Sequence, residues 1–191
     1  MEKKESQRVT ETKEKIRDAF FELYESKKIE KISIRDITDK AQLNRSTFYM
    51  YYRDIYDLLE KTEDEMRGEL TGYIRDTVVR ILREENVQPF LPPKRFFKRY
   101  YKFLRVLLSA NGDPQFIYTM KKEVKVCLKE QLLKEQIPVH QHIDYVMEYI
   151  ASAQIGLVSY WMQNEMEIPI EELGEMIKKI SLNGPLGYLK G

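Results

Sequence analysis

A short run of side chains beginning at Arg45 carries groups that can read nucleic acid. Residues 45–50 combine a guanidinium, two hydroxyls, a phenol and a thioether within less than two turns of helix. Such groups hydrogen-bond base edges and phosphate oxygens in a major groove and touch the apolar atoms of bases. Asn44 is a preferred N-cap residue, so a helix should start here, and its free N–H groups suit a phosphate. The alternative is that Thr47 and Tyr49 merely face solvent.

Residues for other chemistry are sparse. The two histidines, His140 and His142, stand near Asp144 alone, and Cys127 is the single cysteine. No cluster at metal-ligand spacing, phosphate loop, dinucleotide fingerprint or nucleophile elbow is present in the sequence. We therefore expect no catalytic residue, no metal site and no cofactor, and the chain is not expected to be an enzyme.

Short helices should position the reading run. Apolar residues three and four apart predict a first helix over residues 10–26, and Ser33 with Asp36 predicts a capping box for a second helix over 33–41. In the third helix Phe48 and Tyr52 share a face and would anchor it, together with the preceding Leu43. Two short helices joined by about four residues form a helix-turn-helix geometry. A longer fourth helix, capped by Asp54 with Asp57 three residues on, should run from 54 to about 84.

The stretch SIRDITDKAQLNRSTFYMYYRDIYDLL, residues 33–59, resembles the DNA-binding motif of TetR-type transcriptional regulators. This resemblance implies that Arg45, Thr47 and Met50 contact bases and that Tyr49 and Tyr51 hold phosphates. Arg35 of the second helix would add a base or phosphate contact, unless it pairs with Asp39 instead. The predicted DNA-binding residues are Arg35, Asn44, Arg45, Ser46, Thr47, Tyr49, Met50, Tyr51 and Arg53.

Two positions depart from the family pattern. Gln42 replaces the usual turn glycine, and a positive φ there would cost a non-glycine residue about 1 kcal/mol. Ile55 replaces the lysine that often opens the fourth helix and touches phosphate. Arg53, two residues earlier, is expected to take over that contact.

The most apolar helix is predicted over residues 140–164. Its apolar residues cover more of the circumference than one contact within the chain needs, and Ala153 and Gly156 would allow close approach. This segment resembles the C-terminal helices of one TetR-type subgroup, which implies a four-helix interface between two copies of the chain. The alternative is an internal helix of a monomer. The predicted dimer-interface residues are Ile143, Met147, Ile150, Gly156, Leu157 and Trp161.

Aromatic and sulfur-containing side chains are frequent in this half of the chain, and a subset would line an apolar cavity with polar tips. The family resemblance implies that the cavity lies between the fourth helix and its C-terminal neighbours. Its ligand would be an unknown small-molecule inducer. The predicted lining residues are Phe96, Tyr100, Phe103, Met120, Tyr145 and Tyr149.

A basic stripe runs along the helix predicted over residues 94–109, where six Lys and Arg residues recur at helical spacing and no acidic residue occurs between Glu85 and Asp113. An anionic ligand, an acidic partner protein or membrane phosphate would suit this stripe, and so would plain solvent. Its residues are Lys94, Arg95, Lys98, Arg99, Lys102 and Arg105.

Composition sets the wider frame. The chain has 191 residues, 42% of them hydrophobic and 33% charged, with a net charge of +1. No apolar run of membrane-spanning length and no signal peptide is present, so we expect a cytoplasmic protein without stable membrane association.

The pattern predicts an all-α protein with a helix-turn-helix domain over residues 1–53 and a helical bundle for dimerisation and ligand sensing over residues 54–191. We expect a homodimeric, ligand-responsive regulator, a repressor by preference, that binds a palindromic site on double-stranded DNA. Two alternatives stay open. One is an activator controlled by a partner protein, and the other is a helical adaptor or membrane-surface module that binds no DNA.

Overall fold

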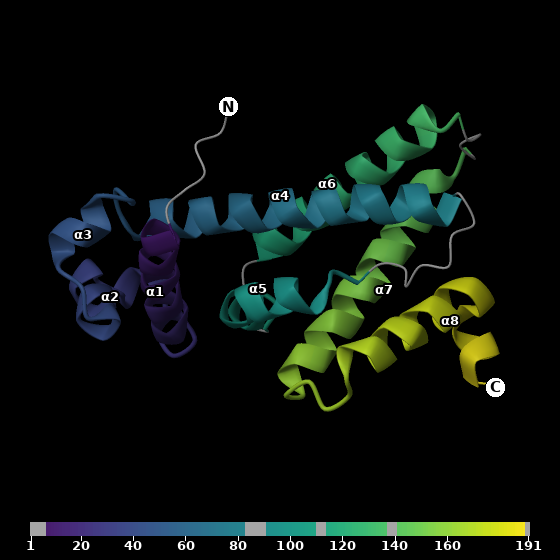
Figure 1. The fold of residues 1–191 in the computed structure, drawn as a ribbon. Helices are drawn as coiled ribbons and strands as arrows, with labels where there is room; N and C mark the ends of the chain where they lie inside the picture. The colour runs from purple at the N-terminus through teal and green to yellow at the C-terminus, as the bar shows by residue number, and fades with distance from the viewer. Residues whose placement is uncertain (1–6, 83–90, 110–113, 137–140, 190–191) are drawn as a thin grey trace. The chain divides into compact units, whose positions relative to one another are not determined.

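The computed structural model describes residues 7–82, 91–109, 114–136 and 141–189, and all regular structure within these ranges is helical (Figure 1). This confirms the predicted all-α class. By their contacts the residues divide into two units, Met1–Met66 and Arg67–Gly191, with the division falling inside one long helix. The elements are α1 (Gln7–Tyr24), the short 3₁₀ helix η1 (Ile29–Lys31), α2 (Ile34–Ala41), α3 (Arg45–Tyr49), α4 (Ile55–Leu82), α5 (Lys94–Leu107), α6 (Pro114–Lys134), α7 (Ile143–Gln163) and α8 (Ile170–Leu189).

The first unit is built around side chains that the helical pattern places on inward faces. α1 packs against α2, and α2 packs against α3. Phe20, Ile37 and Phe48, one from each of these helices, are completely buried, as is Leu58 in the second turn of α4. Such burial stabilises by about 1.5–3 kcal/mol for each large apolar side chain. The short α3 is therefore held by its core residue and not by its own length.

Capping explains where these short helices begin. The Ser33 hydroxyl accepts a hydrogen bond from the Asp36 amide at 3.2 Å, and the Asp36 carboxylate accepts one from the Ser33 amide at 3.0 Å, which confirms the predicted capping box. At α4 the Asp54 carboxylate accepts from the Asp57 amide at 2.8 Å, as predicted. Asn44 occupies the N-cap position of α3, as predicted, although its side chain makes no capping hydrogen bond.

Gln42 forms the turn between α2 and α3 in a left-handed conformation, with φ 56° and ψ 46°. From this position the chain doubles back, and the Leu43 amide donates to the Thr38 carbonyl at 2.9 Å. The positive φ considered from the sequence is therefore present at a non-glycine residue, and it carries the expected strain of about 1 kcal/mol.

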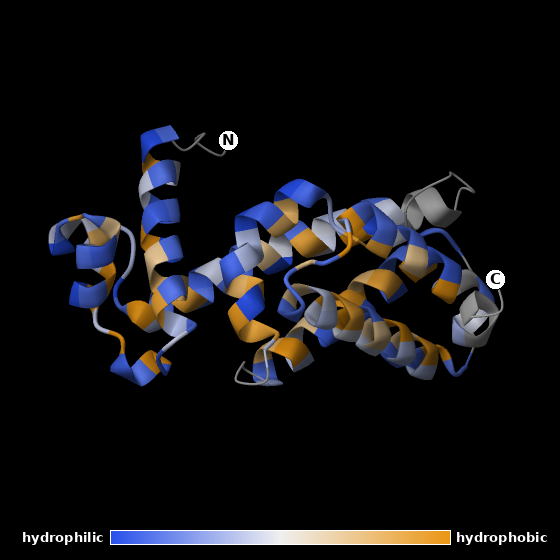
Figure 2. Cartoon of the chain, turned by 90° about the horizontal axis from the view of Figure 1, so that it is seen from below, coloured by the Kyte–Doolittle hydropathy of each residue, from blue (hydrophilic) through white to orange (hydrophobic). Residues whose placement is uncertain are grey.

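The second unit contains α5 to α8, and Figure 2 shows apolar and polar residues alternating along these helices as amphipathic packing requires. α6 packs against α7, and α5 also contacts α7. The Leu108 carbonyl, which follows α5, accepts hydrogen bonds from Ser159 Oγ at 2.7 Å and from Gln163 Nε2 at 2.8 Å on α7. These two bonds satisfy a carbonyl that the end of α5 leaves without a helical partner.

Several helix boundaries differ from the sequence predictions, among them those of α1 and α8. α1 begins at Gln7 and ends at Tyr24, slightly earlier than expected at both ends. The last helix, α8, is predicted from the sequence over about residues 170–182 but extends to Leu189. The chain leaves helical geometry at Gly184, with φ 73° and ψ 165°, and turns helical again at Pro185. Gly184 and Pro185 are residues that typically end a helix. Proline is also favoured in the first turn of a helix, so a new helical segment can begin at Pro185.

Candidate nucleic-acid interface

The short α3 turns most of its polar side chains outward. Phe48 is fully buried, whereas Tyr49 and Met50 beside it are 58% and 73% exposed. Arg45 and Ser46 are exposed as well, and Thr47 is half-buried. The helix therefore presents a guanidinium, a hydroxyl, a phenol and a thioether on a surface fixed from behind by one aromatic ring.

Aromatic packing sets the orientation of α3. The Phe48 ring lies 5.6 Å from the ring of Tyr52, which is also buried, and 5.8 Å edge-on from that of Tyr49. Leu43, predicted to help anchor the helix, is half-buried and not fully buried like Phe48. The reason is its position on the turn, where the left-handed Gln42 has just redirected the chain.

Arg35 lies on α2 and is strongly exposed, with its Nε 3.4 Å from an oxygen of Asp39 one turn later. This is the intrahelical pair that the sequence offered as an alternative to a DNA contact. Because both side chains are solvent-exposed, the pair is worth at most about 0.5 kcal/mol and leaves the guanidinium free to exchange partners. Tyr51 is half-buried, and the ammonium of Lys13 lies 5.8 Å from the centre of its ring.

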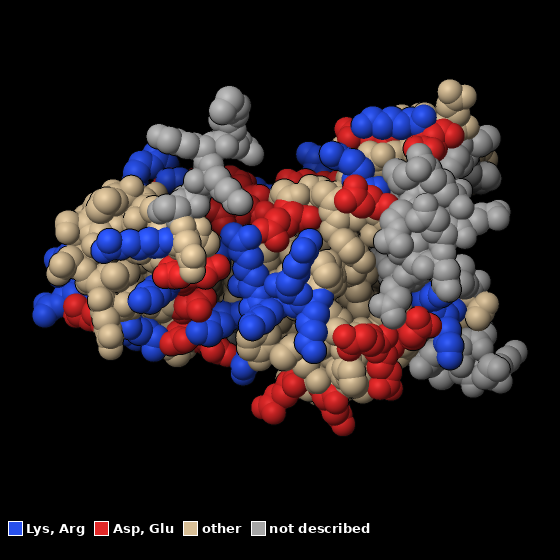
Figure 3. All heavy atoms as spheres, viewed as in Figure 1, with Lys and Arg blue, Asp and Glu red and all other residues tan. Residues whose placement is uncertain are grey.

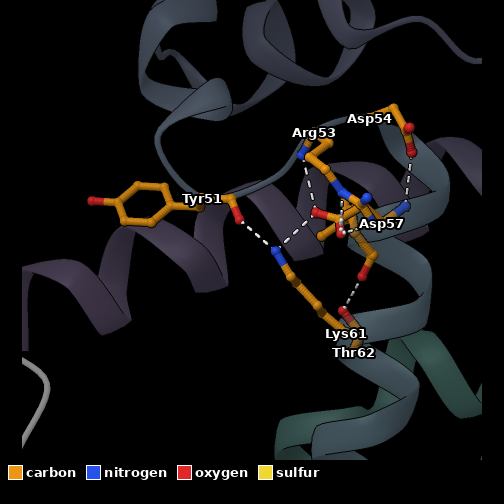
Figure 4. Close-up of polar contacts among 7 residues, drawn as sticks. Tyr51, Arg53, Asp54, Asp57, Lys61 and Thr62 are labelled. Atoms are coloured by element: carbon orange, nitrogen blue, oxygen red, sulfur yellow. Dashed lines mark hydrogen bonds and ion pairs between the residues drawn. The ribbon is translucent and has the colours of Figure 1, made fainter.

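Arg53 is the cation nearest the start of α4, and its side chain is 80% exposed. It forms a two-pronged contact with Asp57, from Nε at 3.1 Å and from Nη2 at 3.0 Å to the same carboxylate oxygen (Figure 4). The other oxygen of Asp57 accepts from the Arg53 amide at 3.0 Å and from Lys61 Nζ at 2.9 Å. Hydrogen bonds from Lys61 and from the Arg53 amide lower the pKa of Asp57 from 3.8 to about 2.

Sequence reasoning recognised Asp57 only as a helix-capping position and passed over Lys61. The signal was present, because residues 53, 57 and 61 follow one another at four-residue intervals with charges of alternating sign. A cation on each side of one carboxylate predicts a bridging contact once the helix start is known.

The six residues predicted to line a ligand cavity do not gather in one place. Phe96, Tyr100, Phe103 and Met120 are buried in the second unit, while Tyr145 and Tyr149 on α7 are 80% and 59% exposed. The rings of Phe96 and Phe103 both pack against Tyr100, whose hydroxyl donates to Glu69 at 2.9 Å. Periodicity places Tyr145 and Tyr149 on one face of a helix but does not say that the opposite face is the one that packs.

A shallow hollow of about 340 Å³ lies between α4 and α6. Its floor includes Cys127, whose thiol donates weakly to the Thr71 carbonyl, with 3.6 Å from sulfur to oxygen. Burial raises the pKa of this thiol, so it stays protonated at neutral pH. None of the six predicted cavity residues lines this hollow. The lining residues are Thr71, Arg75, Thr119, Lys122, Glu123, Val126, Cys127 and Glu130.

The six residues predicted for a dimer interface separate into two groups. Met147 and Trp161 are buried within the protomer, where the Trp161 ring packs edge-on against Phe97 at 5.5 Å and its Nε1 donates to the Ile168 carbonyl at 2.8 Å. Ile143, Ile150 and Leu157 are half-buried, and Gly156 is exposed. Tyr145, Tyr149 and Tyr160 dominate the outward face of α7.

The basic stripe lies on the outer side of α5, and Figure 3 shows Lys and Arg side chains gathered over this helix. Arg99 pairs with Glu69 of α4 and lies over the Tyr100 ring, while Arg105 bonds the Tyr101 hydroxyl at 3.2 Å. Part of the stripe is thus engaged in contacts within the second unit. Lys94, Arg95 and Lys98 are exposed.

Metal binding and membrane insertion receive no support from the described residues. Within those ranges no group of three His, Cys, Asp or Glu side chains is placed to hold an ion, and His140 lies outside them. No helix in the described part of the chain has the length and apolar character needed to cross a bilayer.

Comparisons with known proteins agree with this geometry. Residues 88–183 match a family model described as the C-terminal region of a transcriptional regulator, TetR_C_8. A relative in Bacillus subtilis strain 168, described as the uncharacterized HTH-type transcriptional regulator YxbF, is 26% identical over 182 residues, which is 90% of this chain. The chain spans 45% of the length of that relative.

Two solved structures share the fold. One is the dihydroxyacetone kinase operon activator DhaS, with 18% identity, a TM-score of 0.58, and coverage of 90% of this chain and 94% of that one. The other is a TetR transcriptional regulator from Streptococcus agalactiae 2603V, with 19% identity, a TM-score of 0.50, and coverage of 90% and 93%. At this identity the likeness concerns the arrangement of helices alone.

Proposed function

This chain belongs to the TetR family of transcriptional regulators, a family of DNA-binding proteins and not of enzymes, and on that premise we propose that it represses transcription as a homodimer on a palindromic operator. Each subunit would insert α3 into a major groove, with the two grooves about 34–36 Å apart. One observation carries this proposal: a short helix with exposed polar side chains, held rigidly from behind by the buried Phe48.

The exposed residues divide by their chemistry into base readers and backbone contacts. We assign the bases to Arg45, Thr47 and Met50, because a guanidinium matches guanine and a thioether or methyl group matches the thymine methyl. The phosphate contacts fall to the remaining predicted residues, whose hydroxyl, amide and cationic groups suit oxygen anions. These residues are Arg35, Asn44, Ser46, Tyr49, Tyr51 and Arg53.

The outward face of α7 supports the dimer. Tyr145, Tyr149 and Tyr160 are exposed on it, and a Cβ added at Gly156 would meet nothing within 4 Å. At 100° per residue these four positions fall within about 60° of one another, so they form one stripe. Aromatic residues around a glycine favour close helix packing, and an isologous contact with a second copy would bury them. We propose this stripe as the centre of the interface, with Ile150 and Leu157 at its edge.

Ligand responsiveness is the third part of the proposal, and we place a small-molecule inducer in the second unit. Phe96, Tyr100, Phe103 and Met120 are buried in this unit, and aromatic and sulfur-containing side chains of this kind suit a mostly apolar ligand. An inducer acts only if it binds the DNA-incompetent state more tightly than the DNA-bound one. Domain 54–191 would thus sense the ligand, and domain 1–53 would read the operator.

Selection of bound sequences from a random duplex library tests the proposal directly. We expect a palindrome to be enriched, and we expect its affinity to fall steeply with salt because phosphate contacts release counterions. Fusing the selected site to a reporter promoter then gives the sign of regulation. A library without enrichment would contradict DNA reading, and a reporter that is switched on by the protein would favour the activator alternative.

A further inference from the structure

Asp57 is an acidic residue placed where DNA phosphates would approach. Its carboxylate is only 4% exposed and accepts from four donors on three groups: the Arg53 amide, the Arg53 guanidinium and the Lys61 ammonium. A negative charge beside a DNA-binding helix repels the phosphate backbone, all else being equal. Its presence in the interface therefore calls for a compensating role.

The contact with Arg53 supplies one such role. Both side-chain bonds come from the same edge of the guanidinium, formed by Nε and Nη2, so the Nη1 side is turned away from Asp57. The side chain is nevertheless 80% exposed. An arginine fixed at one edge keeps the opposite side available for an oxygen anion and loses little rotamer freedom on binding.

Lys61 extends the contact to the reading helix. Its ammonium lies between the Asp57 carboxylate at 2.9 Å and the Tyr51 carbonyl at 3.0 Å (Figure 4). It also lies 5.6 Å from the centre of the Tyr52 ring. Tyr51 and Tyr52 follow Met50, the C-cap residue of α3, whereas Lys61 is in the second turn of α4. One carboxylate thus ties the end of the reading helix and the exposed arginine to the same point on α4.

We infer that Asp57 is a positioning residue for operator binding, which holds Arg53 in the orientation that contacts a DNA phosphate and, through Lys61, fixes the end of α3 on α4. This inference rests on the proposed function. It makes a prediction opposite in sign to that of simple electrostatics. Neutralising Asp57 removes one negative charge and so makes the interface more positive by one unit, yet it should weaken binding, because Arg53 and the end of α3 lose their common support.

The test measures operator affinity against salt concentration for the full chain and for the variants D57N, R53A and the double variant. One phosphate contact contributes a slope of about 0.9 in the double-logarithmic plot. Because both subunits of the dimer carry the change, we expect D57N and R53A each to weaken binding about tenfold and to lower the slope by about 1.8, the value for two lost contacts. The double variant should have the same slope as R53A. A D57N protein that binds as tightly as the parent, or more tightly, with an unchanged slope would overturn the inference.

Two controls separate positioning from folding and from charge. E60Q removes an exposed carboxylate from the same part of α4 and should not weaken binding. If D57N fails to give the parent circular dichroism spectrum, R53K carries the test, since it keeps the cation but not the two-pronged edge. R53K should then lose affinity as R53A does, and parent-like affinity would overturn the inference. A parent protein that shows neither operator selection nor salt dependence would instead refute the proposed function itself.

Discussion

Glu148 on α7 accepts a hydrogen bond from Lys125 on α6, with 2.5 Å between Oε2 and Nζ. The other oxygen of the carboxylate accepts from Lys121 at 3.2 Å and from Ser152 at 3.1 Å. These contacts hold two helices of the second unit together at their surface. They also lower the pKa of Glu148 from 4.5 to about 2, with the bond from Lys125 as the largest cause.

Stability should therefore depend on pH through Glu148. A carboxylate whose pKa is lower in the folded state stabilises the protein above its unfolded pKa, and that contribution is lost as the pH falls from 4.5 towards 2. Chemical unfolding should show the parent to be more stable than E148Q at pH 7, by a modest amount because the side chain is half exposed. The difference should shrink progressively below pH 4.5 and be largely lost near pH 2. E167Q, at an exposed glutamate, is the control, and a difference that stays constant with pH would contradict the assignment.

The turn at Gln42 predicts a stabilising substitution. Because Gln42 has a φ of 56°, Gln42→Gly should remove left-handed strain and stabilise the protein by about 1 kcal/mol, less the greater entropy of glycine in the unfolded chain. Gln42→Ala keeps a Cβ and should give no gain. Urea unfolding of both variants measures the difference, and a destabilised glycine variant would show that the Gln42 side chain makes a contact that outweighs the strain.

Local patterns predicted the reading domain well because its elements are short and capped by nearby residues. Phe48, Tyr52 and the Ser33–Asp36 capping box all lie where spacing placed them. The bridge through Asp57 was missed although the start of α4 was predicted, because spacing does not say which rotamer Arg53 adopts.

In the second unit, periodicity grouped residues by helix face but could not decide which face is covered. Trp161 is covered by the ring of Phe97, which is far away in the sequence, and its Nε1 donates to the carbonyl of Ile168, which lies outside any helix. Helical periodicity predicts neither contact. The same limit applies to Tyr145 and Tyr149, which were assigned to a cavity but lie exposed on α7. The sequence of α7 does not show which other helix covers each of its faces.

Base reading should depend on Arg45. Its side chain is exposed at the start of α3. Arg45→Ala should therefore leave the melting temperature unchanged and relax discrimination at one base pair of each half-site by about 1–3 kcal/mol. Competition binding with single-base operator variants measures this loss. Tyr49→Phe is the matched comparison, because loss of a phosphate contact should weaken all sequences alike. If the R45A protein keeps the full base preference of the parent, Arg45 is not a base reader.

Dimerisation should depend on the outward face of α7. Tyr149 is 59% exposed in the protomer, so Tyr149→Glu costs the isolated subunit little but would place a charge in the centre of the proposed interface. We expect the dimer dissociation constant to rise at least about tenfold, equivalent to 1.4 kcal/mol, and operator affinity to fall with it because one α3 alone reads only a half-site. Tyr118→Glu changes an exposed tyrosine on α6 in the same way and should leave both quantities unchanged. Sedimentation equilibrium over a range of concentrations decides the matter. A Y149E protein with the mass and affinity of the parent would remove this face from the interface and require another surface to hold the two reading helices apart.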